Sequence, residues 1–144
     1  MNMEQRAVEI LLVEDNPGDI ILTREALKDA RISNQLQVAK DGEMAIQRLL
    51  GEGEFRGGAK PDLIFLDLNM PKVDGRAVLK EIRRNEALKH IPVVVMTSSK
   101  AEADVARTYS LQASSYIVKP LSPEDLLNVI KSLENFWFTI TVAQ

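Results

Sequence analysis

The chain contains no cysteine, and this absence excludes disulfide bonds, thiolate metal sites and cysteine catalysis. It has one histidine, His90, which precedes an apolar run and is expected at the surface rather than at a catalytic centre. Positive charge is not in excess, because 21 acidic residues face 18 lysines and arginines. The net charge of -3 gives no sign of the basic face that direct nucleic-acid binding requires.

Long apolar runs are also missing. No segment approaches the length of a membrane-spanning helix. The first residues, among them Glu4, Arg6 and Glu9, lack the apolar run of a signal peptide. We therefore expect a soluble protein of the cytoplasm that binds no membrane. Its 144 residues, of which 45% are hydrophobic, suit one domain with a sizeable core.

Short apolar runs alternate with amphipathic segments along the chain. The predicted strands are residues 8–13, 36–39, 63–66, 93–96 and 116–118. The predicted helices are residues 19–30, 43–50, 76–84 and 101–111, with a last helix capped by Ser122 and begun by Pro123. The apolar positions of the first and last helices, which we expect to be buried, are Ile21, Leu22, Ala26 and Leu27, and Leu126, Leu127, Ile130 and Leu133.

Five strand–helix units predict an α/β fold, a doubly wound five-stranded parallel sheet with helices on both faces. The short strands are almost wholly apolar, which is typical of parallel strands buried on both sides. We expect a single domain over residues 1–144, with a core over residues 8–133 and a C-terminal aromatic extension over residues 134–144. Residues 51–61 are rich in glycine and charge and are expected to form a loop.

Polar residues close several of the predicted strands. Glu14-Asp15 follows the first strand, Asp67 the third, Thr97 the fourth and Lys119 the fifth. In a doubly wound sheet the first strand lies beside the third where the strand order reverses, and ligands bind at the carboxyl ends of the strands there. We therefore expect Glu14, Asp15 and Asp67 to meet in one crevice.

Three carboxylates in one crevice repel one another, so they must raise a pKa, find a cation or bind a metal. An all-oxygen site with few protein ligands suits Mg²⁺. Lys119 is a counter-ion for this crevice, and Thr97 can donate a hydroxyl hydrogen bond into it. Plainer interpretations stay open. Glu14-Asp15 alone fits a solvated acidic loop, Lys119 alone a snorkelling surface residue, and Thr97 an ordinary strand end.

At these positions the chain resembles the response-regulator receiver domains of two-component signalling, over residues 9–133. The motifs that carry the resemblance are Glu14-Asp15, Leu66-Asp67-Leu68-Asn69-Met70-Pro71 with Asp74-Gly75 after it, Thr97-Ser98, and Tyr116-Ile117-Val118-Lys119-Pro120. They follow one another at the ends of the first, third, fourth and fifth strands. The resemblance implies a flavodoxin-like sheet of strand order 2-1-3-4-5. It also implies a signalling switch rather than an enzyme.

The resemblance assigns a Mg²⁺ site. Asp15 and Asp67 would bind the ion directly, together with the backbone carbonyl of Asn69. Glu14 stands where aspartate is common in the family, and it would act mainly through a metal-bound water.

The resemblance also assigns a phosphorylation switch. Asp67 would accept a phosphoryl group from a phosphohistidine of a sensor histidine kinase. Lys119 would contact that group, and Thr97 would swing in to bond it. Tyr116 would turn from exposed to buried as Thr97 moves. Phosphoryl transfer needs positioning and charge neutralisation, which the cation and Lys119 would supply.

Within the family, the chain is similar to the small regulators paired with cyanobacterial and bacterial phytochrome kinases, which implies a partner kinase of this type. The features that carry this similarity are residues 14–19, the glycine-rich loop, and the run Asn135-Phe136-Trp137-Phe138. Phe136, Trp137 and Phe138 cannot all face one core, so we predict a homodimer or partner contact through the tail. The alternative is that two of the three pack on their own domain.

Two other functions fit some of the same residues. A phosphatase of the haloacid-dehalogenase type also uses an aspartyl nucleophile, but it needs a second aspartate two residues later, where this chain has Asn69. A receiver that no longer accepts phosphate would serve as an interaction module. Such modules usually lose the aspartate, the lysine or the acidic pair, and all of these are present here.

Overall fold

The computed structural model describes residues 7–51, 60–68, 70, 75–100, 113 and 115–131. Its strands are β1 (Val8–Val13), β2 (Asn34–Ala39), β3 (Leu63–Asp67), β4 (Val93–Thr97) and β5 (Ser115–Val118). Its helices are α1 (Pro17–Asp29), α2 (Gly42–Leu50), α3 (Gly75–Arg84) and α5 (Pro123–Lys131). The helix predicted over 101–111, most of the 51–61 loop and the aromatic extension lie outside the described residues.

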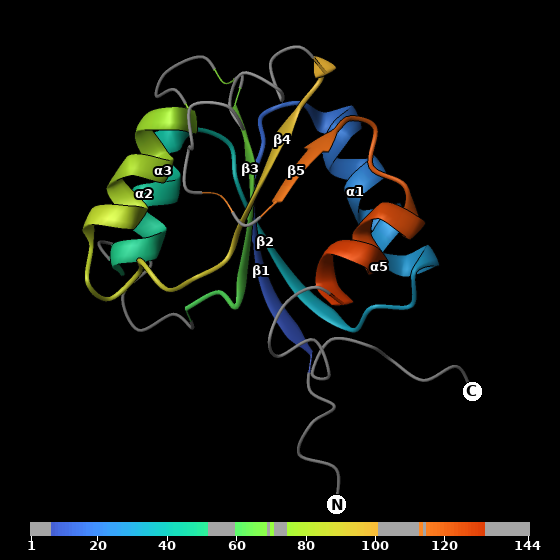
Figure 1. Cartoon of the computed structure of the whole chain (residues 1–144), viewed down its shortest axis with the longest axis horizontal. Coiled ribbons are helices and arrows are strands. Elements are labelled where there is room, and N and C mark those ends of the chain that lie inside the picture. Colours follow the sequence, from blue (N-terminus) through green and yellow to red (C-terminus); the bar gives the residue numbers. More distant parts are fainter. Residues whose placement is uncertain are drawn as a thin grey trace, which may run out of the picture.

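All five strands run parallel in one sheet of order β2-β1-β3-β4-β5, which confirms the predicted fold class. Helices α1 and α5 cover one face of this sheet, and α2 and α3 cover the other (Figure 1). The strand order reverses at β1, which lies between β2 and β3. The carboxyl ends of β1 and β3 are therefore neighbours, at the place where ligands bind in such sheets.

Side chains of the central strands alternate between two hydrophobic cores. In β1, Leu11 and Val13 point into the core under α2 and α3, whereas Ile10 and Leu12 point into the core under α1 and α5. The same alternation holds for β3, all of whose residues are buried. A shift of one residue would exchange the two faces, so this pattern fixes the register of the strands and the position of each strand end.

The face of α1 that packs on the sheet differs from the predicted one. Thr23, Ala26 and Leu27 are buried, but Ile21 and Leu22 are 60% and 49% exposed. The prediction was wrong for Ile21 and Leu22. The side of α1 that faces the sheet carries Thr23, Ala26 and Leu27, and Ile21 and Leu22 lie beside this stripe on the helix surface. In α5, Leu126 is buried as expected, but Leu127 is only half-buried, and Val129, which was not part of the predicted stripe, is buried.

Both of the helices on the α1 side begin with a side-chain cap followed by proline. Asn16 accepts a hydrogen bond from the Asp19 amide at 3.0 Å, so α1 begins at Pro17, two residues earlier than predicted. Ser122 accepts from the Asp125 amide at 3.0 Å, and α5 begins at the predicted Pro123. Among the described residues, no helix combines the length and apolar character needed to cross a membrane.

Candidate functional site

The predicted acidic residues meet at the carboxyl end of the sheet. Glu14 and Asp15 follow β1, and Asp67 is the last residue of β3. One carboxylate oxygen from each of the three lies within 4.8 Å of the others. Glu14 and Asp67 are buried. The pairing of β1 with β3 thus brings together side chains that are more than fifty residues apart in the sequence.

These carboxylates stand at the edge of an open hollow of about 480 Å³. The residues that line it are Glu14, Asp15, Asn16, Pro17, Asp19, Asp67, Ser98 and Lys119. They come from the ends of β1, β3, β4 and β5 and from the first turn of α1. The hollow is large enough to admit a phosphoryl group with its hydration.

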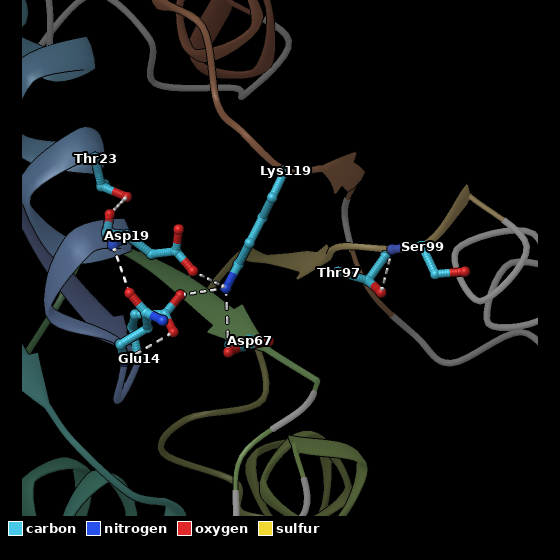
Figure 2. Close-up of polar contacts among 8 residues, drawn as sticks. Glu14, Asp19, Thr23, Asp67, Thr97, Ser99 and Lys119 are labelled. Carbon is cyan, nitrogen blue, oxygen red and sulfur yellow. Dashed lines mark hydrogen bonds and ion pairs between the residues drawn. The ribbon is translucent and has the colours of Figure 1, made fainter.

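Lys119 extends from the end of β5 into the acidic residues (Figure 2). Its Nζ lies 2.6 Å from Glu14 Oε1, 2.9 Å from Asp19 Oδ2 and 3.2 Å from Asp67 Oδ2. The predicted role of counter-ion therefore describes its position, but the third carboxylate that it contacts is Asp19 rather than Asp15. Its backbone is held as well, because the Lys119 amide donates to the Thr97 carbonyl at 2.7 Å.

Asp19 is the residue of this site that the sequence reasoning missed. It lies in the first turn of α1, its amide is bonded to Asn16, and its carbonyl accepts from the Thr23 hydroxyl at 2.9 Å. This turn faces the hollow and directs the carboxylate toward Lys119 (Figure 2). The pair Asn16-Pro17 was the available signal, because a cap and proline there start the helix early enough to place Asp19 in its first turn.

Glu14 is held on both carboxylate oxygens. Oε1 accepts from Lys119, and Oε2 accepts from the Asn16 amide at 3.2 Å. The pKa of Glu14 is raised to about 7, because burial, together with the neighbouring Asp67 carboxylate, outweighs the opposing effect of Lys119. Without a metal, the site therefore favours the protonated form of Glu14 more than water does.

Lys119 stays charged throughout. Burial acts to lower its pKa, but hydrogen bonds to the Glu14 and Asp19 carboxylates and the charge of Asp67 outweigh it, so the pKa lies above the ordinary lysine value. The ammonium is a fixed positive charge in the site at any physiological pH.

The two predicted switch residues lie on the neighbouring strands. Thr97 is the last residue of β4 and is fully buried, and its hydroxyl oxygen accepts from the Ser99 amide at 3.2 Å (Figure 2). Tyr116 is half-buried in β5 and packs on the core shared with α2 and α3. Asn69 and the aromatic residues Phe136–Phe138 lie outside the described residues, and their roles stay predictions. His90 is exposed in the segment before β4, as expected.

Gly75, the first residue of α3, lies directly against the end of β3. A Cβ atom on it would stand 2.5 Å from the Asp67 carbonyl oxygen and 2.8 Å from the Leu68 Cα. Both neighbours are backbone atoms that cannot turn aside, so only glycine fits here. Helix α3 thus packs on the backbone of Asp67 and holds that residue in place.

The residues present fit a divalent cation with oxygen ligands. Glu14, Asp15 and Asp67 supply carboxylate oxygens within reach of one another, beside a hollow that can hold further water ligands. Glu14 and Asp67 are buried, and three carboxylates beside one lysine leave an excess of negative charge, which a bound cation would balance.

A parallel sheet of this order, with an acidic cluster and a lysine at the switch point, matches one family. The family model described as the response regulator receiver domain matches residues 10–131. The chain belongs to this family and is a signalling protein of the response-regulator class.

Its relatives include a cyanobacterial response regulator of known structure. Response regulator Rcp1 of Synechocystis sp. (strain PCC 6803) is 44% identical over 134 residues, which cover 92% of this chain and 91% of Rcp1. The Mn²⁺-bound structure of Rcp1 has a TM-score of 0.73 at 43% identity, covering 95% of this chain and 99% of that one.

Two further solved structures are similar. The phosphorylated cyanobacterial phytochrome response regulator RcpA has a TM-score of 0.74 at 43% identity, covering 91% of this chain and 94% of that one. The bacteriophytochrome response regulator AtBRR has a TM-score of 0.83 at 37% identity, covering 96% and 99%. The chain is thus a homologue of phytochrome response regulators.

Proposed function

We propose that Asp67 accepts a phosphoryl group from a phosphohistidine of a sensor histidine kinase and that this event switches the protein. The observation that carries the proposal is the contact of the Asp67 carboxylate with the Lys119 ammonium beside two further acidic residues. A buried carboxylate at an open hollow can reach a donor, and the ammonium can pair with a phosphoryl oxygen. The phosphorylated state of RcpA supports the same reaction here.

The transfer would proceed at Asp67. One carboxylate oxygen forms a bond to phosphorus while the bond from phosphorus to the donor imidazole nitrogen breaks, and that nitrogen keeps the electron pair. Gly75 and β3 hold Asp67 in position, and Lys119 offers a hydrogen bond to the equatorial oxygens. Positioning and charge neutralisation are the main requirements of this reaction.

We propose Mg²⁺ as the cation of this site. Asp15 and Asp67 would hold it directly, with the Asn69 carbonyl, and Glu14 would act through a bound water. When bound, it neutralises negative charge on the transferring group. The oxygen-only donor set and the Mn²⁺ bound to Rcp1 support a divalent cation. Calorimetry with Mg²⁺ tests this, and Asp15→Asn should weaken binding strongly.

The response would pass to the surface near β4 and β5. A phosphoryl oxygen on Asp67 would accept a hydrogen bond from the Thr97 hydroxyl, whose oxygen now accepts from the Ser99 amide. Tyr116, half-buried on the adjacent strand, would then pack more deeply. Phosphorylation acts in this way by adding charge and acceptor oxygens to a two-state element.

Intact mass after incubation with acetyl phosphate and Mg²⁺ tests the central claim. The wild-type chain should gain one phosphoryl group, and Asp67→Asn should gain none. Asp62→Asn is the matched control, because Asp62 stands at the other end of β3 and should leave the gain unchanged. Absence of any gain would favour a receiver that no longer accepts phosphate, and a gain retained by Asp67→Asn would also contradict the proposal.

We propose that the protein acts in the cytoplasm and that its phosphoryl donor is a kinase of the phytochrome type, on the basis of the similarity to RcpA and AtBRR. Transfer from a phosphorylated phytochrome-type kinase should be faster than from an unrelated histidine kinase of matched phosphorylation level. Short-time transfer assays with labelled phosphate measure this, and equal rates would remove the preference.

We further propose a homodimer that contacts through the last helix and the tail, with Phe136, Trp137 and Phe138 as apolar anchors. The chain would form one domain with this extension. Light scattering should give a dimer mass for the full chain and a monomer mass for a chain that ends at Leu133. A dimer that survives the truncation would disprove the role of the tail.

A further inference from the structure

All the hydrogen-bonding capacity of the Lys119 ammonium is already used. An ammonium has three N–H donors. Those of Lys119 point to Glu14, Asp19 and Asp67, at 2.6, 2.9 and 3.2 Å (Figure 2). Phosphorylation turns the Asp67 carboxylate into an acyl phosphate, so the N–H that points to Asp67 can pass to one phosphoryl oxygen. A second phosphoryl oxygen can accept from Lys119 only in place of Glu14 or Asp19.

The three carboxylates differ in how readily they can release the ammonium. The Glu14 side chain is 1% exposed and forms the shortest contact, and the Asp67 side chain is 4% exposed. A buried carboxylate that loses its cation keeps an uncompensated charge, which disfavours release by Glu14. The charge of Asp67 moves onto the phosphoryl oxygens, so the loss of its own contact has no such cost. The Asp19 side chain is 31% exposed, so water can replace Lys119 there.

The position of Asp19 on α1 also favours release. It lies in the first turn of a helix, where the unpaired amide groups and the helix dipole stabilise a negative charge. Its backbone is fixed by the Asn16 cap and the Thr23 hydroxyl, so the carboxylate stays in place when Lys119 leaves.

We propose that Asp19 is a positioning residue that holds Lys119 before phosphorylation and gives it up to the phosphoryl group. This inference rests on the proposed function of Asp67. Asp19 competes with the phosphoryl oxygens for one N–H of Lys119. Its presence weakens the phosphorylated state relative to the free one, and its removal strengthens it.

The competition predicts a measurable change in the affinity for a phosphoryl mimic. Beryllofluoride binds an aspartate carboxylate without covalent transfer, and calorimetry with saturating Mg²⁺ gives its affinity. Asp19→Asn should bind it about two- to fivefold more tightly than wild type, the range that a partly exposed ion pair represents. Asp19→Glu keeps the carboxylate and should stay close to wild type. Asp29→Asn removes the same charge from the exposed end of α1 and is the matched control.

The same Asp19 variant in a chain without Lys119 tests whether the change in affinity acts through Lys119 or only through the loss of a negative charge near the site. In a Lys119→Met chain, Asp19→Asn should change beryllofluoride affinity much less than it does in wild type, because the shared partner is gone. Far-UV circular dichroism and urea titration check that each variant is folded. Should Asp19→Asn be unfolded, Asp19→Ser carries the same test.

The outcomes separate the two proposals. Tighter binding in Asp19→Asn that disappears in the Lys119→Met background supports the role of Asp19. Wild-type binding with unchanged or weaker affinity in Asp19→Asn overturns it, and so does an equal gain in both backgrounds or in Asp29→Asn. No beryllofluoride binding and no phosphoryl gain in wild type would instead overturn the function proposed for Asp67, and this role with it.

Discussion

The two ends of the β1–β3 pair use the same kind of side chain in opposite ways. At the amino end, Asp62 precedes β3, and its carboxylate accepts from the Glu9 amide at 2.8 Å. The Asp62 amide donates back to the Glu9 carbonyl at 2.7 Å. At the carboxyl end, Asp67 lies beside Glu14 and Asp15 and is bonded to an ammonium.

The difference between these ends lies in what balances the charge of the carboxylates. The Asp62 carboxylate accepts a hydrogen bond from the Glu9 backbone amide. This bond joins the starts of β1 and β3, and it needs neither a cation nor a proton from solution. The carboxylates at the other end face one another, and a single lysine offsets only part of their charge. That end is stable only with protons, a cation or a ligand, and its properties therefore depend on solution conditions.

The largest effect is expected when the positive charge of Lys119 is removed from the carboxyl end of the β1–β3 pair. Lys119→Met should lower the free energy of unfolding by about 3–4 kcal/mol at pH 8 without divalent cations, because it leaves buried carboxylates unpaired. Saturating Mg²⁺ should restore most of this loss. Lys89→Met is the control, because its ion pair with Glu86 is exposed and is expected to contribute less than about 1 kcal/mol. Urea denaturation measures both, and equal losses would erase the contrast.

The pH dependence of the free energy of unfolding should also distinguish the carboxyl end of the pair from the amino end. The pKa of Glu14 is raised from 4.5 to about 7, so between these values the folded state holds a proton that the unfolded state has lost. The stability contributed by this group therefore falls as pH rises through that window, by about 3 kcal/mol at most. Comparison of wild type with Glu14→Gln in metal-free buffer isolates this contribution. A difference that is constant with pH would contradict the raised pKa.

A smaller loss of stability is expected where α3 packs against the carboxyl end of β3. Gly75→Ala should destabilise the protein by about 2 kcal/mol, because the new methyl group overlaps backbone atoms of Asp67 and Leu68. It should also slow phosphorylation by acetyl phosphate. Gly18→Ala is the matched control in the first turn of α1, because its Cβ would meet only the Asn16 side chain, at 3.2 Å. Thermal unfolding compares the two, and equal shifts would argue against a special fit at Gly75.

The smallest effect is expected at the amino end of the β1–β3 pair, where Asp62 lies. Asp62→Ala removes the acceptor of the Glu9 amide and should destabilise by about 1 kcal/mol. This loss should be the same with and without Mg²⁺, in contrast to Lys119→Met. A loss that Mg²⁺ reverses would mean that the two ends communicate electrostatically.

Sequence reasoning succeeded where the pattern is local. The runs that became β3 and β4 are apolar without interruption, because both faces of a central parallel strand are buried, and the predicted strand ends differ by a single residue. β2 was predicted too short at its start. It lies at the sheet edge, where Asn34 and Gln35 remain partly or fully exposed, so the first residues carry no apolar signal.

The candidate site was predictable to the extent that strand order alone determines it. Glu14, Asp15 and Asp67 converge because β1 adjoins β3 in any sheet of this order. The contact of Asp19 with Lys119 spans 100 residues and depends on how α1 and β5 are oriented, which no local pattern records. The exposure of Ile21 escaped prediction for a related reason, since several stripes of α1 are apolar enough to face the sheet.

The backbone bond from the Lys119 amide to the Thr97 carbonyl has a consequence for timing. It joins the ends of β4 and β5, so the strands can stay paired if the Thr97 side chain turns toward Asp67 as the proposed switch requires. Side-chain rotations are far faster than the making or breaking of a phosphoaspartate bond. The duration of a signal would then be governed by hydrolysis at Asp67, and the strand ends would follow without delay.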